Sequence, residues 1–134
     1  KRITDYLINA CRSFIYSTAL PPAIIACSLE GIELVRLEPH RRHQLLNAAE
    51  YFRDKLKDEG FEVRGASQIA PVIIGEAQKT ARLADALRER GWWVLPIRPP
   101  TVPEGESRLR FSITAHHSGE ILKRLIDDIA EIGI

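Results

Sequence analysis

Apolar and polar residues alternate strictly in one stretch near the end of the chain. Three apolar residues and four polar residues take turns there: Arg108, Leu109, Arg110, Phe111, Ser112, Ile113 and Thr114. A period of two is typical of a β-strand with one face in the core and one face outside it. We therefore predict a half-buried strand over residues 108–114, with Arg110 on its polar face.

The other elements follow from apolar spacing and from their flanking residues. Apolar residues three to four positions apart predict helices over residues 4–12 (with Thr4 as its cap), 22–37, 40–59 and 78–90, and a last helix after Ser118. Short apolar runs predict strands over 61–64, 69–75 and 92–98. Residues 13–20 read as an irregular bridge. This order predicts an α+β fold: a long helix, then a small, mainly antiparallel sheet with helices packed on one face.

The helix predicted over residues 22–37 is apolar on most sides. Such a helix is normally buried in a larger protein or in an interface. The chain of 134 residues also contains no methionine and opens with helix under way, which suggests part of a longer polypeptide. We expect one C-terminal domain, in which 1–38 is a helical segment bridging to a missing large domain and 39–134 is the α+β domain.

Composition narrows the classes of function. The net charge of +1 argues against nucleic acid as the main partner, and no apolar run is long enough to span a membrane. Cys11 and Cys27 lack a metal-binding spacing, so we expect no metal site, and a reducing, cytoplasmic location. The cluster of residues 40–43, HRRH, has no carboxylate or thiol ligand beside it and reads as helix surface.

Two places carry candidate chemistry. A proline-rich loop holding Thr101 leads to Arg110, whose planar guanidinium can donate to both oxygens of a carboxylate. The alternative is that Arg110 is a solvated charge that prevents edge-to-edge pairing with another strand. Ser17 and Thr18 stand just before the helix that begins at Pro21-Pro22. Their hydroxyls suit an anion such as phosphate, although a hydroxyl that only caps the helix or turn is the commoner arrangement.

Two blocks of sequence resemble signatures of the α-oxoamine synthases, which are fold-type I enzymes that use pyridoxal 5'-phosphate (PLP). The blocks are RSFIYSTALPPA at residues 12–23 and IRPPTVPEGESRLRFSITAHH at 97–117. The resemblance implies that Arg110 binds the α-carboxylate of the amino-acid substrate, that Thr101 contacts substrate or acyl chain, and that Arg98 lines the same pocket. It also implies a homodimer in which Ser17 and Thr18 reach the cofactor phosphate of the neighbouring subunit.

Within that family, the PPTVP loop is similar to the loop of the biotin-biosynthesis branch. The resemblance then implies an acyltransferase that condenses L-alanine with a pimeloyl thioester, carried by CoA or by a carrier protein, with loss of CO2. None of the lysines stands in the sequence context of the family's cofactor lysine, so we expect no catalytic residue in this segment and no activity from it alone. The alternatives are a glycine C-acetyltransferase-like or 5-aminolevulinate synthase-like sister enzyme, and a stand-alone ligand-binding or interaction domain.

Overall fold

The computed structural model describes residues 1–133 of the chain. Contacts within the chain divide it into two units, Lys1–Glu38 and the part from Pro39 onward.

The first unit is helical. It holds α1 (Arg2–Ala10), α2 (Arg12–Ile15) and α3 (Pro22–Leu37), and α1 contacts α2. The bounds predicted for α3 are confirmed, and Pro22 stands in its first turn, where a missing backbone N–H costs nothing. The predicted cap at Thr4 is wrong, because α1 already begins at Arg2. The bridge is also shorter than predicted, since α2 takes up its first residues.

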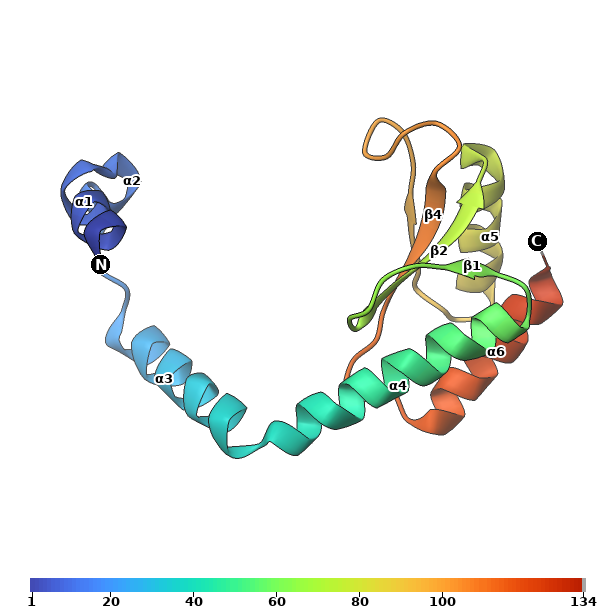
Figure 1. Cartoon of the computed structure of the whole chain (residues 1–134), viewed down its shortest axis with the longest axis horizontal. Coiled ribbons are helices and arrows are strands. Elements are labelled where there is room, and N and C mark those ends of the chain that lie inside the picture. The colour runs from blue at the N-terminus through green and yellow to red at the C-terminus, as the bar shows by residue number, and fades with distance from the viewer. Residues whose placement is uncertain (134) are drawn as a thin grey trace. The chain divides into compact units, whose positions relative to one another are not determined.

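The second unit is an α+β domain. It runs through α4 (Pro39–Asp58), β1 (Glu62–Val63), β2 (Ile69–Gly75), α5 (Ala77–Glu89), β3 (Leu95–Ile97), β4 (Ser107–Ser112) and α6 (Gly119–Ile132) (Figure 1). Its strands form a four-stranded sheet in the order β1-β2-β4-β3, and each neighbouring pair is antiparallel. The two central strands, β2 and β4, are separated in sequence by α5 and β3.

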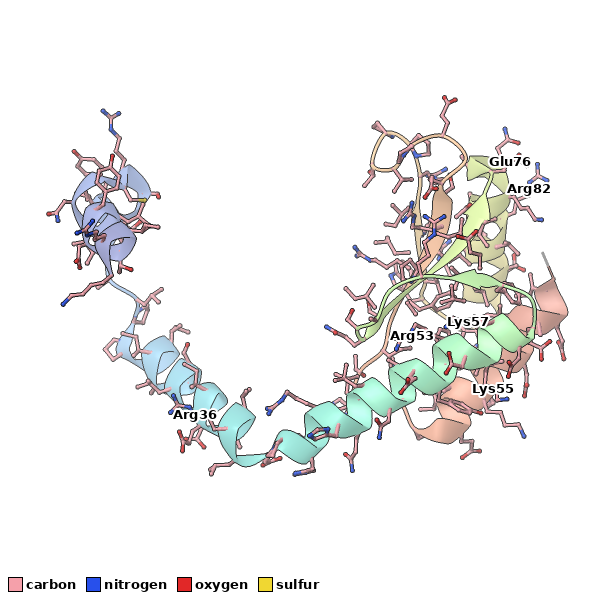
Figure 2. All side chains as sticks on the ribbon, viewed as in Figure 1. Arg36, Arg53, Lys55, Lys57, Glu76 and Arg82 are labelled. Atoms are coloured by element: carbon pink, nitrogen blue, oxygen red, sulfur yellow. The ribbon has the colours of Figure 1, made fainter. Side chains whose placement is uncertain are left out.

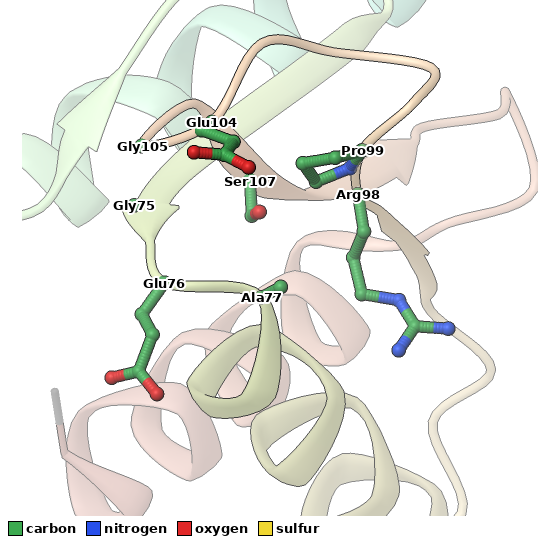
Figure 3. A pocket seen from close by; sticks show the side chains of 8 residues that line it. All are labelled: Gly75, Glu76, Ala77, Arg98, Pro99, Glu104, Gly105 and Ser107. Carbon is green, nitrogen blue, oxygen red and sulfur yellow. The ribbon is translucent and has the colours of Figure 1, made fainter.

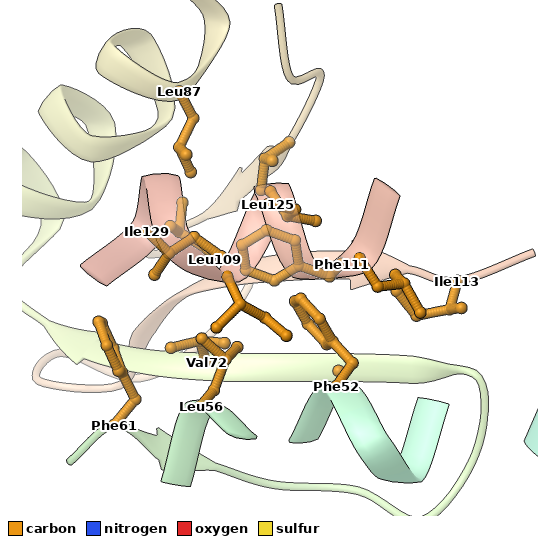
Figure 4. Close-up of a cluster of buried hydrophobic side chains, with 14 of the residues drawn as sticks. Phe52, Leu56, Phe61, Val72, Leu87, Leu109, Phe111, Ile113, Leu125 and Ile129 are labelled. Carbon is orange, nitrogen blue, oxygen red and sulfur yellow. The ribbon is translucent and has the colours of Figure 1, made fainter. Parts of the chain in front are cut away.

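One face of this sheet carries the hydrophobic core. Val72 of β2 and Leu109 and Phe111 of β4 point to that face and are buried (Figure 4). The helices cover it with apolar side chains that are buried in the same cluster: Phe52 and Leu56 of α4, Leu87 of α5, and Leu122 and Ile129 of α6. The rings of Phe52 and Phe111 meet with their centroids 5.2 Å apart. The predicted α+β class, with helices on one face of a small antiparallel sheet, is confirmed.

Local signals fix the ends of two helices. The hydroxyl of Ser118 accepts a hydrogen bond from the backbone N–H of Ile121 at 3.3 Å, so the predicted cap of α6 is confirmed. Gly60 follows α4 with φ of 89°, a left-handed conformation that glycine adopts without strain.

Three predicted strands are shorter in the structure, and the one predicted over residues 61–64 is reduced to β1, Glu62–Val63. The strand predicted from residue 92 begins only at Leu95, because the backbone N–H of Trp92 bonds to Leu87 O at the end of α5. The indole of Trp92 donates to Asp128 of α6 at 2.6 Å, and Arg90 donates to the same carboxylate at 2.8 Å. These two donors, the indole first, lower the pKa of Asp128. The strand predicted to Thr114 ends at Ser112.

Candidate functional site

Arg110 lies on the face of the sheet opposite the core. The residues of β4 alternate between buried and accessible, and Arg110 is one of the exposed ones. Its partners across the two neighbouring strands are Pro71 of β2 and Leu95 of β3. Neither side chain can accept a hydrogen bond. Among the described residues, no carboxylate pairs with the Arg110 guanidinium, so its five N–H donors stay available.

Arg108, two residues earlier on the same face, differs from Arg110. Its Nη2 lies 2.7 Å from Oε2 of Glu106, and its Nε donates to the Glu106 backbone oxygen at 2.8 Å. Arg64 binds the same carboxylate at 2.7 Å, and these guanidiniums, Arg64 first, lower the pKa of Glu106. One carboxylate thus engages two arginines and leaves Arg110 unneutralised.

The surroundings of Arg110 on this outer face are largely apolar. Ile73 of β2 and Ile97 of β3 both lie opposite Arg108, and Ile69 lies opposite Ser112. These isoleucine side chains offer no acceptor that would compete with an incoming anion, although Arg110 itself is exposed to water. The planar fork of a guanidinium binds both oxygens of a carboxylate. This face is therefore suited to a small molecule that carries a carboxylate.

Arg98 follows β3 and does not share the face of Arg110. Ile97 pairs with Arg108 on the outer face, and the next residue, Arg98, extends its side chain alongside α5 (Figure 3). There it lines a cavity of about 720 Å³ together with Ala77 and Ser107. The structure therefore places the two candidate substrate-binding arginines on opposite sides of the sheet.

Thr101 lies in the exposed loop between β3 and β4. Its backbone N–H donates to Arg98 O at 3.0 Å, which closes a turn over Pro99 and Pro100. Its side chain is exposed. Thr101 is thus tied to Arg98 through the backbone, and its hydroxyl faces solvent.

Ser17 and Thr18 belong to the helical first unit. The hydroxyl of Ser17 donates to the backbone oxygen of Ser13, one turn earlier. The hydroxyl of Thr18 is exposed and has no hydrogen-bond partner within residues 1–133. The N-cap of α3 is Pro21, which receives no side-chain hydrogen bond, so neither hydroxyl caps that helix. Thr18 is the more available of the two for a phosphate oxygen.

The lysines of the chain do not form a Schiff-base site with the described residues. Lys55 and Lys57 pair with Asp58 at 3.0 Å and Asp54 at 3.1 Å on the exposed side of α4 (Figure 2). Lys79 and Lys123 stand on α5 and α6, which cover the core face of the sheet, and Lys1 opens the helical first unit. An imine-forming lysine needs an unpaired amine held at the site. The described lysines therefore do not fit PLP at its aldehyde, and contact of Thr18 with the cofactor phosphate stays a prediction.

Two residues of the site were not predicted from the sequence. Ser107 is fully buried on the inner face of β4, and its hydroxyl has no hydrogen-bond partner among the described atoms. Glu106 is the second: its carboxylate pairs with Arg108, and Arg110 has no such partner among the described residues. Ser107 breaks the apolar alternation, but it stands two residues before Leu109, and this spacing of two was the available signal that it shares the buried face.

No three His, Cys, Asp or Glu residues within 1–133 gather into a possible metal site. The helices of that same range are too short or too polar to cross a membrane.

Comparisons with known proteins agree on one family. The profile of the family "Aminotransferase class I and II" matches residues 1–129. An 8-amino-7-oxononanoate synthase from Lysinibacillus sphaericus is 43% identical over 130 residues, which cover 96% of this chain and 33% of that protein. The chain spans about a third of the length of the curated relatives it matches.

Solved structures share the fold. A serine palmitoyltransferase from Sphingomonas wittichii superposes with a TM-score of 0.89 at 26% identity, over 97% of this chain and 33% of that one. An 8-amino-7-oxononanoate synthase from Francisella tularensis gives 0.84 at 26% identity, over 98% and 39%. Other serine palmitoyltransferase structures among the matches contain PLP.

Proposed function

The chain belongs to the aminotransferase class I and II family, and from this membership we propose that it is the C-terminal part of an 8-amino-7-oxononanoate synthase. The relatives that bear this name support the proposal. The reaction joins the α-carbon of L-alanine to the carbonyl carbon of a pimeloyl thioester. The alanine carboxylate leaves as CO2, and the thiol is released. When bound, PLP supplies the electron sink that stabilises the α-carbanion.

The unpaired guanidinium of Arg110 is the observation that carries the proposal. In it, Arg110 holds both oxygens of the alanine carboxylate on the outer face of the sheet. A two-point contact fixes the direction of the bond between the α-carbon and the carboxylate, which is the bond that must break when CO2 leaves. The apolar neighbours Pro71 and Leu95 offer no acceptor that would compete with the carboxylate for this contact.

The loop between β3 and β4 contributes to substrate binding in this proposal. Thr101 offers its exposed hydroxyl to the substrate or acyl chain. Arg98 joins the same pocket only after rotation about its side-chain bonds, because its guanidinium lies beside α5 in this chain (Figure 3). The acyl group arrives as pimeloyl-CoA or on a pimeloyl-carrier protein.

A homodimer completes the proposed site. Thr18, with Ser17 beside it, contacts the phosphate of PLP held by the neighbouring subunit, and Lys1–Glu38 bridges to the rest of the polypeptide. The exposed apolar side chains of α3 support this arrangement: Ile24, Ile25, Leu29, Ile32, Leu34, Val35 and Leu37. A surface of this kind is typical of a helix that is covered in the assembled protein. The cytoplasm is the proposed location, in keeping with the free thiols of Cys11 and Cys27.

The test uses the complete polypeptide that carries this segment, loaded with PLP. Release of CO2 and of free thiol is measured with pimeloyl-CoA and, in turn, L-alanine, glycine and L-serine. We expect turnover with L-alanine to exceed the other two. A preference for glycine with acetyl-CoA would indicate a sister acyltransferase, and a preference for L-serine with a long-chain acyl-CoA would indicate a palmitoyltransferase-like enzyme. An absence of condensation with any pair would refute the proposal.

A further inference from the structure

We propose that the cavity beside the start of α5 binds a phosphate group, separately from the carboxylate site on the outer face of the sheet. The cavity lies on the helix side of the sheet, where Ala77, Arg98 and Ser107 line it (Figure 3). Its volume is about 720 Å³. The inference goes beyond the proposed function and does not depend on it.

The first element of this site is the N-terminus of α5. The residue before the helix, Glu76, makes no side-chain cap. The first helical hydrogen bond runs from the backbone N–H of Thr80 to Glu76 O, at 3.0 Å. The amides of Ala77 and the two residues after it precede the first turn of helical hydrogen bonds. These N–H groups and the positive end of the helix dipole favour an oxyanion.

Ser107 is the second, independent element. Its side chain points from β4 toward the start of α5 (Figure 3), and the residue is 0% exposed. Its hydroxyl has no hydrogen-bond partner among the described atoms, which is unusual for a buried polar group. A phosphate oxygen at the inner end of the cavity would provide the missing acceptor.

Arg98 supplies the charge, and two glycines shape the wall. Arg98 enters the cavity from β3, with no ion-pair partner within the described chain. Gly75 and Gly105 both have positive φ, and a Cβ added to Gly75 would lie 3.5 Å from Gly105 O. The wall here is therefore bare backbone. Helix amides, a hydroxyl and a guanidinium approach from three elements, which suits the tetrahedral arrangement of phosphate oxygens better than a planar carboxylate.

Two carboxylates also line the cavity and limit its affinity. The side chain of Glu76 points away from Ser107, whereas that of Glu104 lies on the same side as Ser107 (Figure 3). A carboxylate beside a bound anion repels it. Replacing Glu104 by glutamine should therefore strengthen phosphate binding. A cavity with a merely structural role would show no such gain in affinity.

The experiment titrates inorganic phosphate into the full chain, with chloride holding the ionic strength constant, while NMR follows the backbone amides of residues 77–79. We expect saturable shifts of these amides, tighter binding in Glu104→Gln, and binding weakened about fivefold in Ser107→Ala and in Arg98→Gln. Arg110→Gln removes the same charge from the other face of the sheet and should leave phosphate affinity unchanged.

Ser107→Ala removes a hydroxyl that makes no hydrogen bond to the described residues, so this variant should keep its fold, which its amide spectrum verifies. A parallel titration with glycerol 3-phosphate distinguishes the source of the group: tighter binding than inorganic phosphate indicates an ester ligand, and equal binding indicates free phosphate. Unsaturable shifts, or equal weakening by Ser107→Ala and Arg110→Gln, would overturn the proposal.

Discussion

Replacing Arg110 by glutamine tests the proposed carboxylate site most directly. Glutamine keeps a polar side chain of moderate length on the outer face of β4 but removes the charge and the two-pronged donor. Because Arg110 makes no ion pair with any described residue, the substitution breaks no ion pair or hydrogen bond of the described chain. We therefore expect stability to change by less than about 0.5 kcal/mol, so that a loss of binding reports on the substrate contact.

The size of the effect follows from the geometry. A hydrogen bond to a charged group contributes about 1.5–3 kcal/mol, and a forked guanidinium makes two of them to one carboxylate. Arg110 is exposed, and this lowers the sum to roughly 2–4 kcal/mol, because water replaces part of what is lost. Affinity for L-alanine should fall by roughly 30- to 700-fold. Arg110→Lys, which keeps the charge but loses the fork, should lie between wild type and Arg110→Gln.

The assay is the change in cofactor absorbance when L-alanine is titrated into the complete, PLP-loaded polypeptide. Arg108→Gln is the matched control, since Arg108 lies on the same strand and face but is engaged by Glu106. Its affinity for L-alanine should stay within about twofold of wild type. Near-normal affinity in Arg110→Gln, or equal losses in the two variants, would refute the assignment of the carboxylate to Arg110.

Four further predictions concern cofactor retention and stability. Thr18→Val should weaken PLP retention about fivefold, as followed by dialysis of the loaded enzyme, and Ser17→Ala should weaken it less, because the Ser17 hydroxyl is already bonded to Ser13; equal effects would argue against the phosphate contact. Phe52→Ala should lower the free energy of unfolding by about 3–5 kcal/mol in urea, against less than about 0.5 kcal/mol for the exposed neighbour variant Glu50→Ala. Ser118→Ala should cost about 1 kcal/mol by the same measurement, and Ser118→Asp should restore most of it. Because the pKa of Asp128 is lowered in the folded chain, its stabilising effect is complete above the ordinary value of 3.8 and is lost as pH falls through the lowered value; urea titrations below pH 5 should therefore show a shallower loss of stability in Asp128→Asn than in wild type.

The elements with strong local patterns could be predicted from the sequence. The apolar run over residues 69–75 predicted both bounds of β2 correctly. Pro22 and the break at residues 38–39 predicted both bounds of α3. Ser118 was identifiable as a cap because serine accepts a hydrogen bond at the start of a helix. These features depend on neighbours in sequence, which is why spacing alone was enough.

Features that depend on pairing between strands could not be predicted in the same way. The sequence brings Arg98 and Arg110 within one signature, but the register of β3 on β4 decides which face each residue takes. That register pairs Ile97 with Arg108 and so turns Arg98 toward α5. The contrast between Arg108 and Arg110 depends on Glu106, and the late start of β3 at Leu95 depends on the hydrogen bond from the Trp92 backbone N–H to Leu87 O.

The order of the strands sets a condition on how the domain is made during synthesis. The central pair joins Ile69 of β2 to Ser112 of β4, across the whole of α5 and β3. Until the ribosome has released β4, β2 has only the short β1 as a partner, and its apolar run stays exposed at a sheet edge. Any product that ends before Ser107 therefore leaves that edge open, and the nascent domain is most vulnerable to aggregation just before β4 emerges.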